Sequence, residues 1–148
     1  MGTTRNLEAR KCRNHNYYYL WNGRALGNDA SEELGMQDQI EVIDLRTLFP
    51  LDEDTILKSV KKTGKCLVVT EEPSNNSFAR ALAGKIQEEC FKHLDAPVMV
   101  IGSENIPAIP LNSILEQTMI PSTEKVKNKI EALLNYCLLY TSPSPRDS

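Results

Sequence analysis

The chain has 148 residues, which is enough for one domain with a sizeable core. Hydrophobic residues make up 41% of it and charged residues 25%, and the formal net charge is -3. This composition is that of an ordinary globular protein, and the charge excludes the strongly basic surface of a nucleic-acid-binding protein. No apolar run in the sequence is long enough to cross a bilayer as a helix.

Strand-like and helix-like segments alternate through residues 30–136. Short runs of branched or continuously apolar residues predict strands at 40–45, 66–70 and 98–101. Helical periodicity and capping residues predict the end of a helix at 30–34, further helices at 52–63 and 77–91, a short helix at 111–117 and a last helix from 122. This alternation predicts an α/β domain, doubly wound, with a mostly parallel sheet and helices on both faces. We expect Val42, Val68 and Val100 to lie side by side on neighbouring strands.

The four cysteines are far apart in the sequence and form no Cys-x-x-Cys pair. Cys66 and Cys90 fall at apolar positions of a predicted strand and a predicted helix, so we expect reduced thiols in the core of a protein from a reducing compartment. A disulfide or a metal site is the alternative. With His15 and His93 as the only histidines, a zinc site is not expected.

Four charged residues follow two of the predicted strands, at the edge where open α/β sheets place ligands. Asp44 and Arg46 either face a ligand or form a salt bridge or cap contact that fixes the next loop, and we favour the loop-fixing role. Glu71 and Glu72 either line a cleft or partner interface or belong to a solvated loop, and we favour the loop. Lysines near the end of the helix 52–63 suit the negative end of its dipole: Lys58, Lys61, Lys62 and Lys65.

Several longer motifs together resemble one family. They are Glu41–Leu48 with Pro50–Asp52, Ser59–Gly64, Glu71–Pro73, Leu94–Val98, Ile106–Pro110 and Ile120–Ser122. In this order they resemble the C-terminal domain of the transketolase-like family. The greatest resemblance is to the beta subunit, or beta half, of the thiamine-dependent first component of 2-oxoacid dehydrogenases, of the branched-chain or pyruvate type. One departure is Ser74–Ser77, which stands where the family has a glycine-rich turn.

This resemblance implies a parent enzyme that oxidatively decarboxylates a 2-oxoacid and transfers the acyl group to lipoamide. Thiamine pyrophosphate and Mg would be bound by domains absent from this chain, so no catalytic, cofactor-binding or metal-binding residue carries over and the fragment alone is expected to be inactive. The implied partners are the alpha subunit or half, a second beta subunit and a lipoyl acyltransferase core, with no nucleic acid and no membrane. The implied location is the bacterial cytoplasm or the mitochondrial matrix. The alternatives are a fragment of a transketolase or deoxyxylulose-phosphate synthase, or a free-standing α/β interaction module.

The two ends of the chain do not continue the pattern. Residues 1–29 lack the first strand and the Tyr-Gly-x-Gly turn of the family, and we expect them to be a frameshifted or disordered segment that leaves the sheet without its first strand. Residues 137–148 are a short apolar patch and a Ser/Pro tail, and we expect a disordered, artefactual tail there.

Overall fold

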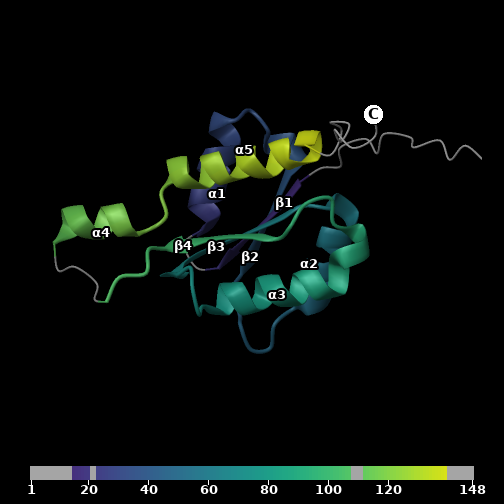
Figure 1. Ribbon diagram of the computed structural model, residues 1–148, viewed down its shortest axis with the longest axis horizontal. Helices are drawn as coiled ribbons and strands as arrows, with labels where there is room; N and C mark the ends of the chain where they lie inside the picture. Colours follow the sequence, from purple (N-terminus) through teal and green to yellow (C-terminus); the bar gives the residue numbers. More distant parts are fainter. Residues whose placement is uncertain (1–14, 21–22, 108–111, 140–148) are drawn as a thin grey trace, which may run out of the picture.

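The computed structural model describes residues 15–20, 23–107 and 112–139, as one sheet covered by helices (Figure 1). The strands of this part of the chain are β1 (His15–Leu20), β2 (Ile40–Leu45), β3 (Cys66–Pro73) and β4 (Met99–Ser103). Its helices are α1 (Gly23–Glu33), α2 (Glu53–Thr63), α3 (Phe78–Cys90), α4 (Ser113–Met119) and α5 (Thr123–Leu139), with the 3-10 turns η1 (Gln37–Gln39) and η2 (Phe91–His93). The strands and helices predicted from residue 30 onward are all present, to within a few residues at their ends.

The sheet is parallel throughout, in the order β2-β1-β3-β4. In Figure 1, α1 and α5 cover one face and α2 and α3 cover the other. The apolar run that begins at Cys66 feeds both layers, because successive side chains of a strand point to opposite faces. Cys66 and Val68 pack with α2 and α3, whereas Leu67 and Val69 pack with α1 and α5. The predicted doubly wound α/β class is therefore confirmed.

The centre of the sheet holds a strand that the sequence patterns did not indicate. The position expected to be left open by a missing first strand is occupied by β1, which pairs with β2 on one side and β3 on the other. Val68 does pair with Val100, but Val42 pairs with Tyr17 of β1, so the expectation that Val42 neighbours Val68 is wrong. Three consecutive tyrosines have high strand propensity, and pairing on both edges supplies what the sequence lacks in periodicity.

The predictions for the two terminal segments, 1–29 and 137–148, can be compared with the structure only in part. Of the segment 1–29, residues 1–14 and 21–22 lie outside the described residues, and α1 begins at Gly23, before the predicted boundary. Of the tail, residues 140–148 lie outside them as well, and the backbone of α5 continues to Leu139. The frameshift and the artefactual tail stay predictions.

The helices start and end where the capping residues predict. Asp52 accepts a hydrogen bond from the backbone N–H of Thr55 at 3.1 Å at the start of α2. Ser77 accepts one from the N–H of Arg80 at 3.2 Å at the start of α3. Gly64 ends α2 in the left-handed region, at φ 79°, which a residue without Cβ adopts at little cost. These caps fix the loops at both edges of the sheet.

In the described part of the chain, every helix is too short or too polar to cross a membrane.

Candidate interaction surface at the carboxyl edge of the sheet

Asp44 and Arg46 lie at the carboxyl end of β2, as predicted, and they contact each other. The Nε of Arg46 lies 3.3 Å from Oδ2 of Asp44. The Arg46 side chain is 77% exposed and the Asp44 side chain 33% exposed, so the pair contributes little to stability. The contact leaves most of the Arg46 side chain open to solvent, and the loop-fixing role of the pair stays a prediction.

A hollow of about 260 Å³ lies beside this pair. It is bounded by the end of β2, the connection 46–52 and the first turns of α2. Its apolar walls come from Ile43, Leu45, Leu51 and Ile56, and its polar rim from Asp44, Arg46, Thr47, Asp52 and Thr55. No sequence pattern indicates this hollow, because it depends on how the loop folds back toward α2.

The same loop carries two exposed apolar side chains. Phe49 is 97% exposed and Leu48 43% exposed, although both lie within five residues of buried Leu45. The loop runs from the end of β2 to the start of α2 and extends outward from the body of the domain (Figure 1). Single exposed apolar residues are common on protein surfaces, whereas a contiguous exposed apolar patch marks an interaction surface.

Glu72 fixes the start of α3. Its Oε2 accepts a hydrogen bond from the backbone N–H of Phe78 at 3.1 Å, next to the cap that Ser77 makes. A carboxylate at this place satisfies a free N–H group and suits the positive end of the helix dipole. The Glu71 side chain is exposed, while its backbone carbonyl accepts a hydrogen bond from Oγ of Ser103.

Close backbone packing joins the ends of β3 and β4. The N–H of Ser74 donates to the carbonyl oxygen of Ser103 at 3.0 Å. A Cβ built on Gly102 would lie 2.5 Å from the carbonyl oxygen of Glu72, which is closer than nonbonded carbon and oxygen atoms approach. Gly102 is therefore required by this contact, and through it supports the position of Glu72.

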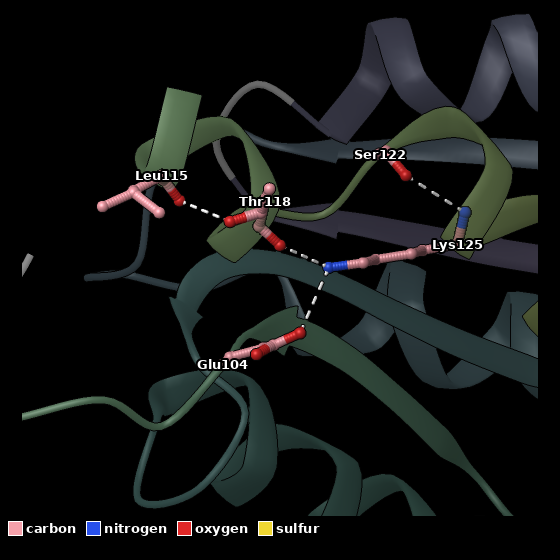
Figure 2. A network of polar contacts seen from close by, with 5 residues as sticks. All are labelled: Glu104, Leu115, Thr118, Ser122 and Lys125. Atoms are coloured by element: carbon pink, nitrogen blue, oxygen red, sulfur yellow. Dashed lines mark hydrogen bonds and ion pairs between the residues drawn. The ribbon is translucent and has the colours of Figure 1, made fainter. Parts of the chain in front are cut away.

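A polar network holds the next helix, α4, at its carboxyl end (Figure 2). The Nζ of Lys125 donates to the backbone carbonyl of Thr118 at 2.8 Å and lies 3.5 Å from Oε1 of Glu104. Ser122 caps the start of α5 by accepting from the N–H of Lys125 at 3.3 Å. The Oγ1 of Thr118 donates to the carbonyl of Leu115 at 2.7 Å. These contacts tie α4 to the end of β4 and the start of α5.

The other side of α4 is apolar and uncovered. Ile114 is 71% exposed, Leu115 55% and the preceding Ile106 39%. In Figure 1, α4 lies beyond the ends of the strands, away from the layered body. The carboxyl edge therefore presents apolar side chains at two places, one after β2 and one after β4.

Lys65 has a role that the sequence did not indicate. The sequence places it among the lysines near the end of α2 that suit the helix dipole, but Lys65 is 2% exposed and lies outside that helix. Its Nζ donates to the carbonyl oxygens of Leu133 and Leu134 at 3.0 and 3.1 Å. Lys65 thus joins the amino end of β3 to α5, and it is a structural cation.

The two described cysteines are buried and reduced, as predicted. Burial, and then the nearby charge of Cys90, raise the pKa of the Cys66 thiol well above its usual value. Burial is also the main cause that raises the pKa of Cys90. Both thiols are therefore poor nucleophiles.

The residues at the carboxyl edge do not fit a diphosphate cofactor with its metal ion. The amino end of α2 is capped by Asp52 and followed by Glu53 and Asp54, and that of α3 is capped by Ser77 and Glu72. These carboxylates would repel a diphosphate at the helix ends that normally attract one. Among the described residues, no group of three His, Cys, Asp or Glu side chains could hold a metal ion.

Parallel strands with helices on both faces define a doubly wound α/β domain. The family model of the transketolase C-terminal domain matches residues 28–126, and the chain belongs to this family. The resemblance to 2-oxoacid dehydrogenase beta subunits is confirmed by curated relatives.

Three relatives illustrate the range of similarity. The chain is 40% identical over 110 residues to the 3-methyl-2-oxobutanoate dehydrogenase subunit beta of Mycobacterium tuberculosis, covering 74% of this chain and 31% of the relative. It is 36% identical over 95 residues to the 2-oxoisovalerate dehydrogenase subunit beta of Bacillus subtilis, covering 64% and 29%. It is 34% identical over 105 residues to the pyruvate dehydrogenase E1 component subunit beta of Rhizobium meliloti, covering 70% and 23%. The chain thus spans between 23% and 31% of the length of these relatives.

A solved structure shows the same fold. It is described as a split gene transketolase, inactive beta4 tetramer, and it matches with a TM-score of 0.66 at 16% identity, covering 85% of this chain and 41% of that one.

Proposed function

We propose that the chain is the C-terminal assembly domain of a thiamine-dependent 2-oxoacid dehydrogenase beta subunit. The observation that carries this proposal is the division of roles at the carboxyl edge. Glu72 accepts a hydrogen bond at the start of α3 and Asp44 contacts Arg46, while large apolar side chains such as Phe49 and Ile114 are left exposed. An edge of this kind suits packing against protein rather than bond making.

The parent enzyme would oxidatively decarboxylate a 2-oxoacid and transfer the acyl group to lipoamide. Thiamine pyrophosphate and Mg would supply the carbanion chemistry from other domains, and this domain would contribute contacts with the alpha subunit, a second beta subunit and the lipoyl acyltransferase core. The relatives are named for branched-chain oxoacids or pyruvate at similar identity, so the proposal covers both substrate types. Bacterial cytoplasm or mitochondrial matrix is the proposed location, and the buried reduced thiols suit either.

A complementation experiment tests this proposal. The B. subtilis beta subunit would be produced without the region that matches this chain, together with its alpha subunit, and the full 148-residue chain would be supplied as a separate polypeptide. We expect the chain to associate with the truncated subunit. We also expect it to restore the 2-oxoacid-dependent reduction and acylation of lipoamide. The chain alone, given the oxoacid, lipoamide, thiamine pyrophosphate and Mg, should show no turnover.

A matched control separates assembly from nonspecific rescue. A variant with Ile114→Asp and Leu115→Asp on α4 should associate less well, because charge at an apolar interface is left without a partner. A variant with Phe91→Ser, at the opposite edge of the sheet, should behave as the unchanged chain. If the unchanged chain associates instead with a transketolase that lacks its own C-terminal domain, and not with the beta subunit, the proposed parent enzyme is the wrong one.

A further inference from the structure

We propose that α4 is an arm held in place by a charge latch at Lys125, and that loss of the Lys125 charge releases the arm while the rest of the domain stays folded. The arm is the helix Ser113–Met119, and the latch is the contact between Nζ of Lys125 and the backbone carbonyl of Thr118. The latch also fixes the position of Ile114 and Leu115. In that respect it deepens the proposed function and rests on it.

The arm has little packing of its own. All residues of α4 are exposed or half-buried, and none of them belongs to the two hydrophobic clusters on the faces of the sheet. Figure 1 shows α4 beyond the ends of the strands, apart from the layered body. The helix has seven residues, and isolated helices shorter than about 12–15 residues are at best marginally stable in water. Contacts at the ends of the arm are therefore needed to hold it.

Two groups outside the arm bind its carboxyl end (Figure 2). Nζ of Lys125 donates to the carbonyl oxygen of Thr118 at 2.8 Å, and the backbone N–H of Glu104 donates to the carbonyl oxygen of Met119 at 3.2 Å. The last carbonyls of a helix lack partners within it, and the negative end of the helix dipole favours a cation there. The amino end is capped by Asn112, the residue next to the helix. The ammonium group thus binds the arm where a positive charge is most effective.

Lys125 is unfavourably placed in its own helix. It is the third residue of α5, where the dipole of that helix is positive. Ser122 caps α5 by accepting from the N–H of Lys125 at 3.3 Å, and in a capping box the residue at this place is a glutamate or glutamine that bonds back to the cap. The Nζ of Lys125 is directed instead at α4 and at Glu104. A lysine at this position therefore serves the arm rather than α5.

Amide hydrogen exchange of the full chain, measured residue by residue by NMR, tests the latch. The Glu104 amide reports on the docking of the arm, because it donates to Met119. The Lys125 side chain is 42% exposed, so we expect a moderate effect: Lys125→Gln should speed exchange at Glu104 and along α4 by about three- to tenfold. The amides of β3 should exchange at unchanged rates. Unchanged exchange at Glu104, or equal acceleration in β3, overturns the proposal.

Two further variants separate the charge of Lys125 from other effects of substitution. Lys125→Arg keeps the charge and should keep exchange along α4 within about twofold of the unchanged chain. Lys127→Gln is the matched control, because Lys127 also lies on α5 and its Nζ is 3.4 Å from Oε2 of Glu33, compared with 3.5 Å between Lys125 and Glu104. It should leave exchange along α4 within about twofold. If Lys127→Gln released the arm as Lys125→Gln does, a general loss of charge on α5 would explain the effect and the latch would be refuted.

Urea unfolding gives a readout that a purely structural role of Lys125 would move in the other direction. Glutamine at this position completes the capping box and removes a cation from the positive end of α5. Lys125→Gln should therefore leave the urea midpoint unchanged or raise it, while it releases the arm. A lowered midpoint would show that Lys125 stabilises the domain as a whole, and would contradict a latch that acts on α4 alone.

The exchange rates and the complementation experiment can fail separately. If the chain complements the truncated beta subunit but Lys125→Gln leaves the arm in place, the latch is wrong and the proposed function stands. If the arm is released as expected while complementation fails, the latch is a device of this fold in a domain with another parent.

Discussion

Gly102→Ala is the sharpest test of the packing that supports the carboxyl edge. A Cβ at this position would lie 2.5 Å from the carbonyl oxygen of Glu72 and 3.1 Å from the Cα and N of Ser74. All three are backbone atoms, so no side-chain rotation can relieve the contact and the end of β3 must move away from β4. Overpacking of this kind costs about 1–3 kcal/mol, and we expect a loss of about 2 kcal/mol in the free energy of unfolding. Urea titration followed by circular dichroism measures it.

The matched control is Gly84→Ala, which adds the same methyl group in the middle of α3. Nothing lies within 4 Å of a Cβ built there. Replacing glycine by alanine inside a helix stabilises it by about 0.5–1 kcal/mol, so this variant should be more stable than the unchanged chain. Opposite signs for the two substitutions are the expected result. If Gly102→Ala left the urea midpoint unchanged or raised it, the close approach of β3 and β4 would be refuted.

Three further predictions concern Lys65, Cys66 and Asp52. Lys65→Met keeps the apolar stem of the side chain but removes the ammonium group and its two charge-assisted hydrogen bonds to α5, and should lower the free energy of unfolding by about 2 kcal/mol in urea. A change within error would show that the ammonium group does not hold the helix. Because burial raises the pKa of the Cys66 thiol, iodoacetamide at neutral pH should modify it only as fast as the fold opens, as followed by peptide mass spectrometry with Cys66 in urea as the reference. Hydrogen bonds from the Thr55 side chain and backbone lower the pKa of Asp52, so its stabilising effect is present above the ordinary carboxyl pKa and is lost as the pH falls through the lowered value. Asp52→Asn should therefore lose stability less steeply in acid than the unchanged chain, and equal slopes in urea titrations at a series of acid pH values would contradict this.

Most of the fold from residue 30 onward could be predicted because its elements carry local signals. The run Cys66–Val69 is continuously apolar, and it is buried between helix layers on both faces. Asp52, Gly64 and Ser77 lie at the helix ends that their chemistry favours. Such signals depend only on neighbours in the sequence, and tertiary packing reinforced them here rather than overriding them.

The strand β1 could not be predicted in this way. His15–Leu20 has neither an alternating pattern nor β-branched residues, and the family match begins only at residue 28. Its place is set by two partners that follow it in sequence, β2 and β3, whose edges it joins. A strand defined by its partners has little signal of its own.

Only part of the candidate site could be predicted from the sequence, because some of its residues are positioned by local structure and others by distant segments. The positions of Asp44, Arg46 and Glu72 could be predicted because the carboxyl ends of parallel strands meet at one edge of the sheet. Lys65 was misassigned because its acceptors are 68 and 69 residues away in the sequence. A long side chain can be exposed or buried at the same sequence position, and only the distant helix decides which.

The exposed apolar residues mark the limit of sequence reasoning most clearly. Leu45, Leu48, Phe49 and Leu51 are similar in hydrophobicity, yet Leu45 is buried, Leu51 is half-buried and Phe49 is almost fully exposed. Periodicity cannot separate Leu48, Phe49 and Leu51, because these three residues belong to no helix or strand. Leu45 belongs to the hydrophobic cluster on the α2 and α3 face of the sheet and Leu51 packs against it, while Leu48 and Phe49 belong to neither cluster. The loop that carries Leu48 and Phe49 is held at one end by the buried end of β2 and at the other by the cap of α2. These two side chains are therefore presented to solvent in a defined position. Such an arrangement lowers the entropic cost of binding a partner.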